Sequence, residues 1–198
     1  MEHYYSKHTD TKSKEDVIHA GLRGREWAFI TDVGVFSKSG VDFGTRLLLE
    51  TVQVSQGDRI LDLGCGYGVM GVVLASELSE GHVVMSDINE RALSLARKNS
   101  QKYRLTNVSF HSSDGFQDIP RQAFDHIVTN PPIRAGKATM YKLFEDAAGY
   151  LSEHGSLWIV IHKKHGAESA VKKLENLYKT VEIANKKSGY QIIKAYSS

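Results

Sequence analysis

The stretch Asp62-Leu-Gly-Cys-Gly-Tyr-Gly68 restricts the fold more than any other part of this sequence. It follows a short apolar run at residues 59–63 and precedes a helical pattern at residues 69–79. Its alternating glycines let the backbone turn sharply and approach a ligand more closely than a Cβ would permit. Ligands of open α/β sheets bind where strands end in such loops. We therefore predict an α/β domain with a ligand site at this loop.

Strand and helix patterns continue to alternate after the loop. Further strands are predicted at residues 82–86, 108–111, 124–129 and 156–162, and helices at 89–103, 141–151 and 167–178. Such alternation implies a mostly parallel sheet with helices on both faces. Residues 181–184 and 190–196 predict a final hairpin, which would place an antiparallel strand at the sheet edge or between two neighbours.

The first part of the chain reads differently. Residues 1–25 are polar with balanced charge, and we expect a loosely ordered lead-in. A strand at 26–31 and an amphipathic helix at 45–54 follow. We treat residues 1–55 as an N-terminal extension packed on a single domain formed by residues 56–198.

Two acids accompany the glycine loop, Asp62 at the end of the first strand of the domain and Asp87 at the end of the second. Gly66-Tyr-Gly-Val-Met-Gly71 also matches the dinucleotide pattern, in which Asp87 would hold a ribose. However, the Asp62 carboxylate would repel a pyrophosphate resting on the adjacent helix N-terminus. S-adenosylmethionine carries an ammonium, a sulfonium and a ribose but no phosphate. We therefore favour S-adenosylmethionine over a nicotinamide cofactor.

Asn130-Pro-Pro-Ile133 follows the apolar run at 124–129 and contains two of the three prolines of the chain. Proline fixes φ and lacks an amide donor, so the strand must stop and Asn130 is held in a stiff, extended turn. Asparagine offers a carbonyl acceptor, which suits an amino group. Alone, this motif is also typical of a rigid turn without chemistry. Beside the glycine loop and two strand-end acids, it favours chemistry at an amine.

These motifs, in this order, resemble those of class I S-adenosylmethionine-dependent methyltransferases. The chain is most similar to the small-domain RsmC-like family, which methylates a guanine N2 in small-subunit (16S) ribosomal RNA. The strings that carry this similarity are Thr31-Asp-Val-Gly-Val-Phe-Ser37, Val41-Asp-Phe-Gly44, the glycine loop and Asn130-Pro-Pro-Ile-Arg-Ala-Gly-Lys137. The resemblance implies a Rossmann-like domain with a seven-stranded sheet whose last strand is antiparallel.

The resemblance also implies site residues. The cofactor would be bound by residues of the extension, the glycine loop and the strand ends, namely Phe36, Ser37, Asp62, Gly64, Cys65, Gly66, Gly68, Asp87, Ile88, Asp114 and Asn130. Cys65 would be a small filler in the loop, and Asp114 would reach the adenine amino group. Asn130 Oδ1 and the Pro131 carbonyl would hold the reacting amine and act as catalytic groups. The substrate side would be formed by Pro132, Ile133, Arg134 and Lys137.

Ile133 departs from a common pattern, because many amino-group methyltransferases carry an aromatic residue after Asn-Pro-Pro. Isoleucine offers no π face for base stacking. Two alternatives use the same chemistry, methylation of a protein glutamine amide or of adenine N6, and both usually have the aromatic residue. A third alternative is a non-catalytic RNA-binding ribosome assembly factor, against which the intact acids and glycines argue.

The charge distribution bears on RNA as a partner. The formal net charge is only +2, but residues 162–198 hold eight lysines against three glutamates. This excess could face a phosphate backbone, although a solvated lysine-rich surface would give the same count. With 198 residues there is no room for the second, degenerate methyltransferase copy of long family members. We therefore expect ribosomal RNA or the 30S subunit to dock on the extension or on this basic tail.

Composition narrows the setting. The single cysteine excludes an intrachain disulfide and fits a reducing compartment. No apolar run approaches the roughly 20 residues that span a bilayer, and the first residues lack the features of a signal peptide. We therefore expect a cytoplasmic protein without membrane contact. The nine histidines are scattered, so we predict no metal site. The sequence favours neither a monomer nor a homodimer.

Overall fold

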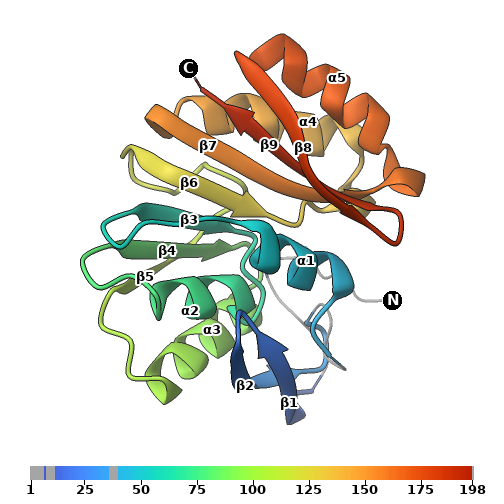
Figure 1. Cartoon of the computed structure of the whole chain (residues 1–198). Helices are drawn as coiled ribbons and strands as arrows, with labels where there is room; N and C mark the ends of the chain where they lie inside the picture. Colours follow the sequence, from blue (N-terminus) through green and yellow to red (C-terminus); the bar gives the residue numbers. More distant parts are fainter. Residues whose placement is uncertain (1–6, 8–11, 36–39, 198) are drawn as a thin grey trace.

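A seven-stranded sheet forms the centre of the computed structural model, which describes residues 7, 12–35 and 40–197 (Figure 1). Its strands are β3 (Arg59–Leu63), β4 (His82–Asp87), β5 (Val108–Ser112), β6 (Phe124–Thr129), β7 (Leu151–His162), β8 (Thr180–Lys187) and β9 (Tyr190–Tyr196). Their order is β5-β4-β3-β6-β7-β9-β8. The strands from β3 to β7 are parallel, and β9 lies antiparallel between β7 and β8. The predicted sheet and terminal hairpin are confirmed.

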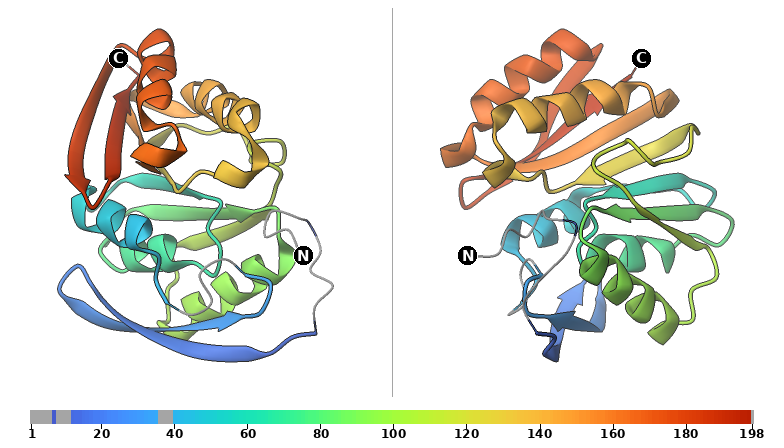
Figure 2. Two further views of the ribbon diagram at one scale, coloured as in Figure 1. Left: turned by 90° about the vertical axis from the view of Figure 1, so that its right-hand side faces the viewer. Right: turned by 180° about the vertical axis from the view of Figure 1, so that it is seen from behind.

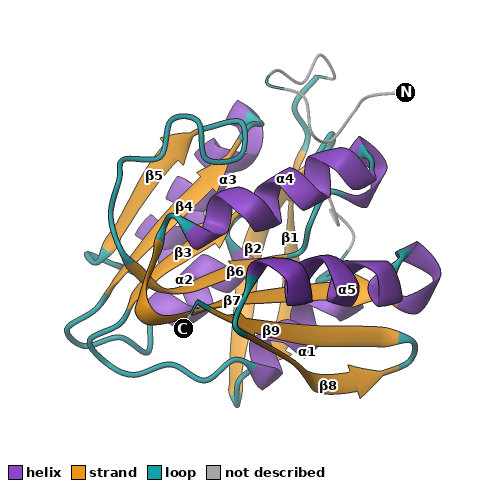
Figure 3. Ribbon diagram, turned by 90° about the horizontal axis from the view of Figure 1, so that it is seen from above, coloured by secondary structure: helices purple, strands orange, loops and turns teal. Residues whose placement is uncertain are grey.

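Helices cover both faces of the sheet, as predicted (Figures 1 and 3). One face carries α1 (Phe43–Thr51), α2 (Val69–Ala75) and α3 (Glu90–Lys102), and the other carries α4 (Lys137–Ala148) and α5 (Ala167–Leu177). Successive residues of β3 alternate between the two cores, with Ile60 in the first and Leu61 in the second. Burial on both faces explains the short apolar runs of the central strands, Ile60-Leu61 in β3, Val83-Val-Met85 in β4 and Ile127-Val128 in β6.

An N-terminal hairpin lies outside the helical layer, away from the sheet (Figure 2). It consists of β1 (Glu15–Leu22) and β2 (Arg25–Asp32) in antiparallel register. The expectation of a loosely ordered lead-in up to residue 25 was therefore wrong for β1. The strand was missed because its first three residues are exposed and only Ile18, Ala20 and Leu22 show the alternating burial of a strand. Asn99 of α3 holds the hairpin, accepting from the Ile30 amide at 2.8 Å and donating to the Ile30 carbonyl at 3.0 Å.

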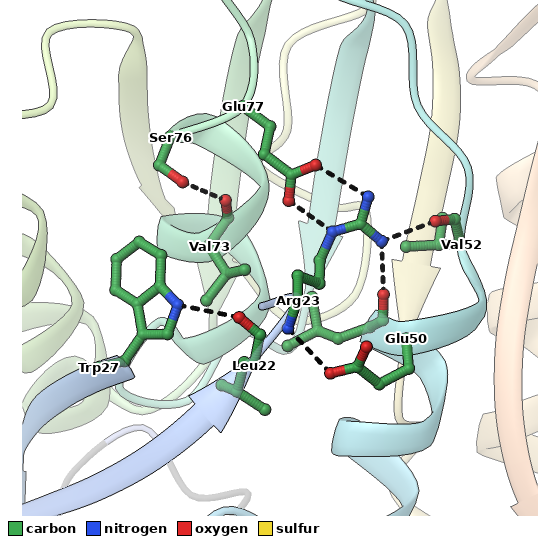
Figure 4. Close-up of polar contacts among 9 residues, drawn as sticks. Leu22, Arg23, Trp27, Glu50, Val52, Val73, Ser76 and Glu77 are labelled. Carbon is green, nitrogen blue, oxygen red and sulfur yellow. Dashed lines mark hydrogen bonds and ion pairs between the residues drawn. The ribbon is translucent and has the colours of Figure 1, made fainter. Parts of the chain in front are cut away.

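Arg23, in the turn of this hairpin, fixes the end of α1 (Figure 4). Its Nη1 donates to the carbonyl oxygens of Leu49 at 2.6 Å and Val52 at 2.8 Å. These carbonyls belong to the last turn of α1, where intrahelical partners run out. The guanidinium also forms a two-pronged ion pair with Glu77, which follows α2. The hairpin thus fixes α1, whose other end reaches the site described below.

The helix before β7 differs from its prediction. It was expected at residues 141–151, but α4 begins at Lys137 and ends at Ala148. A short 3-10 helix, η1 (Ile133–Ala135), and Gly136 at a φ of +99° precede it. The first turns of α4 are mostly exposed, so the apolar periodicity used for the prediction starts late. A second 3-10 helix, η2 (Lys163–His165), joins β7 to α5. None of the described helices is long and apolar enough to cross a membrane.

Candidate active site

A cavity of about 300 Å³ lies where β3, β4, β5 and β6 end, on the side that faces the viewer in the left panel of Figure 2. The glycine loop forms one wall, and the Cys65 amide ties it to β4 by donating to the Ser86 carbonyl at 2.8 Å. Gly64 and Gly66 have φ values of +71° and +57°, which side chains disfavour. A Cβ at either position would point into open space. The missing side chains therefore leave room for a ligand against the loop.

Asp87, at the end of β4, lies between the loop and the start of α3. Its Oδ2 accepts from the Gly66 amide and its Oδ1 from the Asn89 amide, both at 2.8 Å. Burial raises the pKa of Asp87, and the backbone donors partly oppose this shift. Asn89, the first residue of the helix predicted at 89–103, caps α3 by accepting from the Ala92 amide at 3.1 Å. The arrangement holds the Asp87 carboxylate at the cavity wall.

Asp62 lies beneath the loop and does not line the cavity. Its Oδ2 accepts from the Gly71 amide in α2 at 2.7 Å, whereas its buried Oδ1 has no partner among the described residues. Burial, with a smaller contribution from the negative charge of Asp87, raises the pKa of Asp62 to about 7. The carboxyl thus anchors the first turns of α2 to the end of β3.

The raised pKa of Asp62 gives a pH-dependent stability. The unfolded carboxyl ionises near pH 3.8 and the folded one near 7, so this contribution is complete below pH 3.8 and is lost as pH rises to 7. The loss amounts to at most about 4 kcal/mol. Asp62→Asn keeps the acceptor for Gly71 but does not titrate. We therefore expect the melting temperature of the ligand-free wild type to fall relative to Asp62→Asn between pH 4 and pH 7, by up to about 10 °C. Parallel melting curves would contradict this burial argument.

Asn130 directly follows β6, whose end is tied to β3 by a hydrogen bond from Thr129 Oγ1 to the Leu63 carbonyl at 2.9 Å. The side-chain Nδ2 of Asn130 donates to Asp42 Oδ2 at 3.1 Å and to Thr45 Oγ1 at 3.2 Å. A carboxylate can only accept, so the amide nitrogen must face Asp42 and Oδ1 must point the other way. Among the described residues, none donates to this Oδ1. Asn130 therefore presents a free acceptor.

The same Asp42 carboxylate begins α1. Its Oδ2 accepts from the Thr45 amide at 3.2 Å as the N-cap of the helix. Both Asp42 and Thr45 line the cavity. One acid thus fixes the start of a helix and the side-chain orientation of the asparagine after β6.

The structure brings many of the predicted site residues together, but not all of them. Those that line the cavity are Gly64, Cys65, Gly66, Asp87, Ile88, Asp114, Asn130 and Pro132. Those that do not are Asp62, Gly68, Pro131, Ile133, Arg134 and Lys137. Phe36 and Ser37 lie outside the described residues.

The predicted residues away from the cavity have visible reasons for their places. Gly68 packs against α3, because a Cβ there would lie 3.1 Å from that of Ala96. Pro131 is buried, and Ile133 packs against the core beneath α4. Arg134 and Lys137 are exposed. Burial raises the pKa of the Cys65 thiol well above its usual value, in keeping with a filler that does not act as a nucleophile.

Asp42 and Thr45 are the main residues that the sequence did not single out for the site. The string Val41-Asp-Phe-Gly44 contributed to the family resemblance, but no role was assigned to its acid. A capping rule offered a signal, because Asp is a preferred N-cap residue before an apolar helix. The hydrogen bond between Asp42 and Asn130 left no signal in the sequence, since the two residues lie 88 positions apart.

The charge of the cavity indicates the kind of ligand. Among the described residues that line it are three carboxylates, Asp42, Asp87 and Asp114, and no lysine, arginine or histidine. A pyrophosphate would be repelled here, whereas a cationic ligand would be attracted. This argues against the nicotinamide alternative. Nowhere in the described parts of the chain do three or more His, Cys, Asp or Glu side chains gather as a metal ion would require.

The family model of the methyltransferase small domain matches residues 26–194. The chain belongs to this family. An uncharacterized Bacillus subtilis protein, YbxB, is 46% identical over 98% of this chain and 98% of its own length. Ribosomal RNA small subunit methyltransferase C of Haemophilus influenzae is 38% identical, over 64% of this chain and 39% of the relative.

A solved structure of a ribosomal RNA methyltransferase has the same fold. It is the Thermus thermophilus 16S rRNA N2 G1207 methyltransferase (RsmC), in complex with AdoMet and guanosine. The TM-score is 0.82 at 26% identity, over 92% of this chain and 50% of that one. This chain therefore spans half or less of the named ribosomal RNA methyltransferases to which it is similar.

Proposed function

We propose that this protein transfers a methyl group from S-adenosylmethionine to the exocyclic N2 amine of a guanine in small-subunit ribosomal RNA. The main support is the orientation of Asn130, whose free Oδ1 lies beside an acid-lined cavity. Membership of the methyltransferase small domain family supports the reaction, and the named relatives support the substrate. Ribosomal RNA as substrate would place the reaction in the cytoplasm.

The residues of the cavity fit S-adenosylmethionine. Its sulfonium would supply an activated methyl group. Asp87 has the position of a ribose-binding acid at the end of the second domain strand, and Gly64 and Gly66 leave the loop backbone open to close approach. Asp114, after β5, would accept from the adenine amino group, as its sequence position suggested. None of the described residues that line the cavity carries a positively charged side chain, so a positively charged ligand without phosphate is favoured.

Asn130 and Pro131 would make the amine reactive. The lone pair of guanine N2 is delocalised into the ring, so the neutral amine is a poor nucleophile. Asn130 Oδ1 would accept one of its N–H groups and direct the lone pair away from the ring plane. Pro131 is buried and does not line the cavity itself, but its backbone carbonyl, next to Asn130, is the proposed acceptor for the second N–H group. Both oxygens would also stabilise the positive charge that develops on nitrogen during methyl transfer. The product ammonium is acidic enough to lose its proton to water, so no strong base is required.

Methyl incorporation tests the proposal and separates the alternatives. The purified chain is incubated with methyl-labelled S-adenosylmethionine and 30S subunits, 50S subunits or 16S RNA. We expect label in the RNA of the 30S subunit. Label in protein would indicate a glutamine amide as acceptor, and label on adenine would indicate the N6 reaction. Absence of label, together with no cofactor binding by calorimetry at millimolar ligand, would favour the non-catalytic assembly factor.

A further inference from the structure

Aromatic rings form a row beside the cavity. Phe43, the first residue of α1, is 37% exposed and directly follows the cavity-lining Asp42. Its ring lies 5.4 Å from that of Tyr190, the first residue of β9. Tyr190 in turn meets His162 edge-on at 4.8 Å, and His162 lies 5.6 Å from His165. The row thus leads away from the cavity across the ends of α1, β9 and β7.

Two glycines leave the space that the rings of this row occupy. Gly189 has a φ of +83°, and a Cβ there would lie 2.5 Å from Nε2 of His162. A Cβ on Gly44 would lie 3.1 Å from the ring of Tyr190. Tyr190 and His162 are also direct partners in the antiparallel pairing of β7 and β9. The rings therefore approach their neighbours more closely than other residues at these glycine positions would allow.

The lysines of the C-terminal part are sorted by the fold into two groups. One group is engaged or remote: Lys172 and Lys173 pair with glutamates, Lys194 covers two aromatic rings, and Lys179 lies at the opposite end of the β8–β9 hairpin. The other group comprises four exposed lysines near the aromatic row, Lys163, Lys164, Lys186 and Lys187. The part of the chain that the structure describes places no carboxylate within ion-pair distance of these four.

Backbone contacts bring three of this second group to the row. The Lys163 amide donates to the Gly189 carbonyl at 2.8 Å, and the Lys164 amide donates to Nδ1 of His162 at 3.0 Å. Lys187 is the cross-strand partner of Tyr190. Lys186 pairs with Gln191 and so points to the other face of the hairpin. Three exposed lysines, Lys163, Lys164 and Lys187, are therefore held next to the aromatic row. Figure 1 shows the start of α1, η2 and the β8–β9 turn on one side of the molecule.

We propose that these aromatic residues and lysines form a docking surface for a single-stranded RNA segment next to the target guanine. The aromatic–lysine surface comprises Phe43, His162, His165 and Tyr190 with Lys163, Lys164 and Lys187. This inference rests on the proposed function. Aromatic rings stack on unpaired bases, and lysines neutralise the phosphates between them. The surface supplies the stacking that Ile133, which packs against the core, does not provide.

Fluorescence anisotropy with a labelled single-stranded RNA of about 12 nucleotides, within the usual site sizes, tests the surface. Phe43→Leu keeps an apolar residue at an exposed helix start but removes the π face. We expect it to weaken binding about tenfold, as the loss of one stacked base would. Its affinity for a duplex of the same sequence should not change, because paired bases offer no free face.

The double variant Lys163→Ser/Lys187→Ser tests the charges. We expect it to reduce the slope of log affinity against log salt by about 1.4 for single-stranded RNA. Lys179→Ser removes the same kind of charge from the opposite end of the hairpin and should leave the slope at the wild-type value. Calorimetry with S-adenosylmethionine should give wild-type affinity for all variants, which shows that they are folded.

The outcomes separate the surface from the proposed function. RNA binding that weakens in Phe43→Leu and in the lysine pair, but not in Lys179→Ser, supports the surface. Wild-type affinity in both surface variants, with methylation of RNA intact, overturns the surface and leaves the function standing. Equal weakening on single-stranded and duplex RNA overturns stacking by Phe43. A wild-type chain that neither binds nor methylates RNA overturns the function and the surface with it.

Discussion

Asn130→Ala is expected to lower kcat for methyl transfer by about 100-fold or more, the usual effect of removing one preorganised polar group from a transition state. The substitution deletes the acceptor whose orientation is fixed by Asp42 and Thr45. Binding of S-adenosylmethionine should change little, because the glycine loop and Asp87 are untouched. Single-turnover rates with saturating cofactor, together with calorimetry, separate the two effects.

Asn176→Ala is the matched control, since Asn176 is exposed on α5, on the other face of the sheet. It should retain wild-type turnover. If Asn130→Ala methylated its substrate at the wild-type rate, Asn130 would have no catalytic role. A loss of cofactor affinity that accounted for the whole effect would make Asn130 a cofactor-binding residue instead.

Asp42→Asn should reduce kcat about 30-fold by acting through Asn130. The Asp42 carboxylate can only accept a hydrogen bond, whereas an asparagine at this position can also donate one, so it no longer fixes which end of the Asn130 amide faces it. The new side chain can donate to Asn130 Oδ1 and so occupy the acceptor needed for the amine. Helix α1 should persist, because asparagine caps a helix about as well as aspartate. Turnover and thermal unfolding of the variant test both statements. Asp146→Asn, which changes a half-buried acid on α4 that pairs with Lys142 and does not line the cavity, is the control.

A double-mutant cycle decides whether Asp42 is a positioning residue. If Asp42 acts through Asn130, the double variant Asp42→Asn/Asn130→Ala should be no slower than Asn130→Ala alone. Multiplication of the two single losses would instead mean that Asp42 contributes independently of Asn130. The cycle therefore distinguishes orientation of the amide from direct participation in the reaction.

Local pattern was sufficient for much of the fold and for part of the candidate site. Glycines between a strand and a helix, an acid closing the next strand and an Asn-Pro-Pro turn are short-range signals. They selected Gly64, Gly66, Asp87 and Asn130, which all line the cavity, and the alternation of strand and helix patterns predicted the sheet. The start of a helix at Asn89 was predictable for the same reason, because helix capping depends on neighbouring residues.

Features that depend on contacts between residues far apart in the chain could not be predicted from the sequence. The contacts of Asn130 with Asp42 and Thr45 join residues 88 and 85 positions apart. Strand-end position could not tell whether the Asp62 carboxyl lines the cavity or lies under the loop, because that depends on how α2 packs. β1 has only a short stretch of alternation, and its buried residues gain partners only when the hairpin packs. The excess of lysines in residues 162–198 was evident from the sequence, but only the fold shows which of them lie near the aromatic row.

Nucleoside analysis of the product tests the proposed reaction most directly. Small subunits that lack the modification are incubated with the protein and S-adenosylmethionine, and their RNA is digested and analysed by mass spectrometry. We expect N2-methylguanosine to form with the wild type and to form about 100-fold more slowly with Asn130→Ala. A methyl group on any other atom, or N2-methylguanosine formed equally fast by both proteins, would contradict the proposed function of Asn130 at this site.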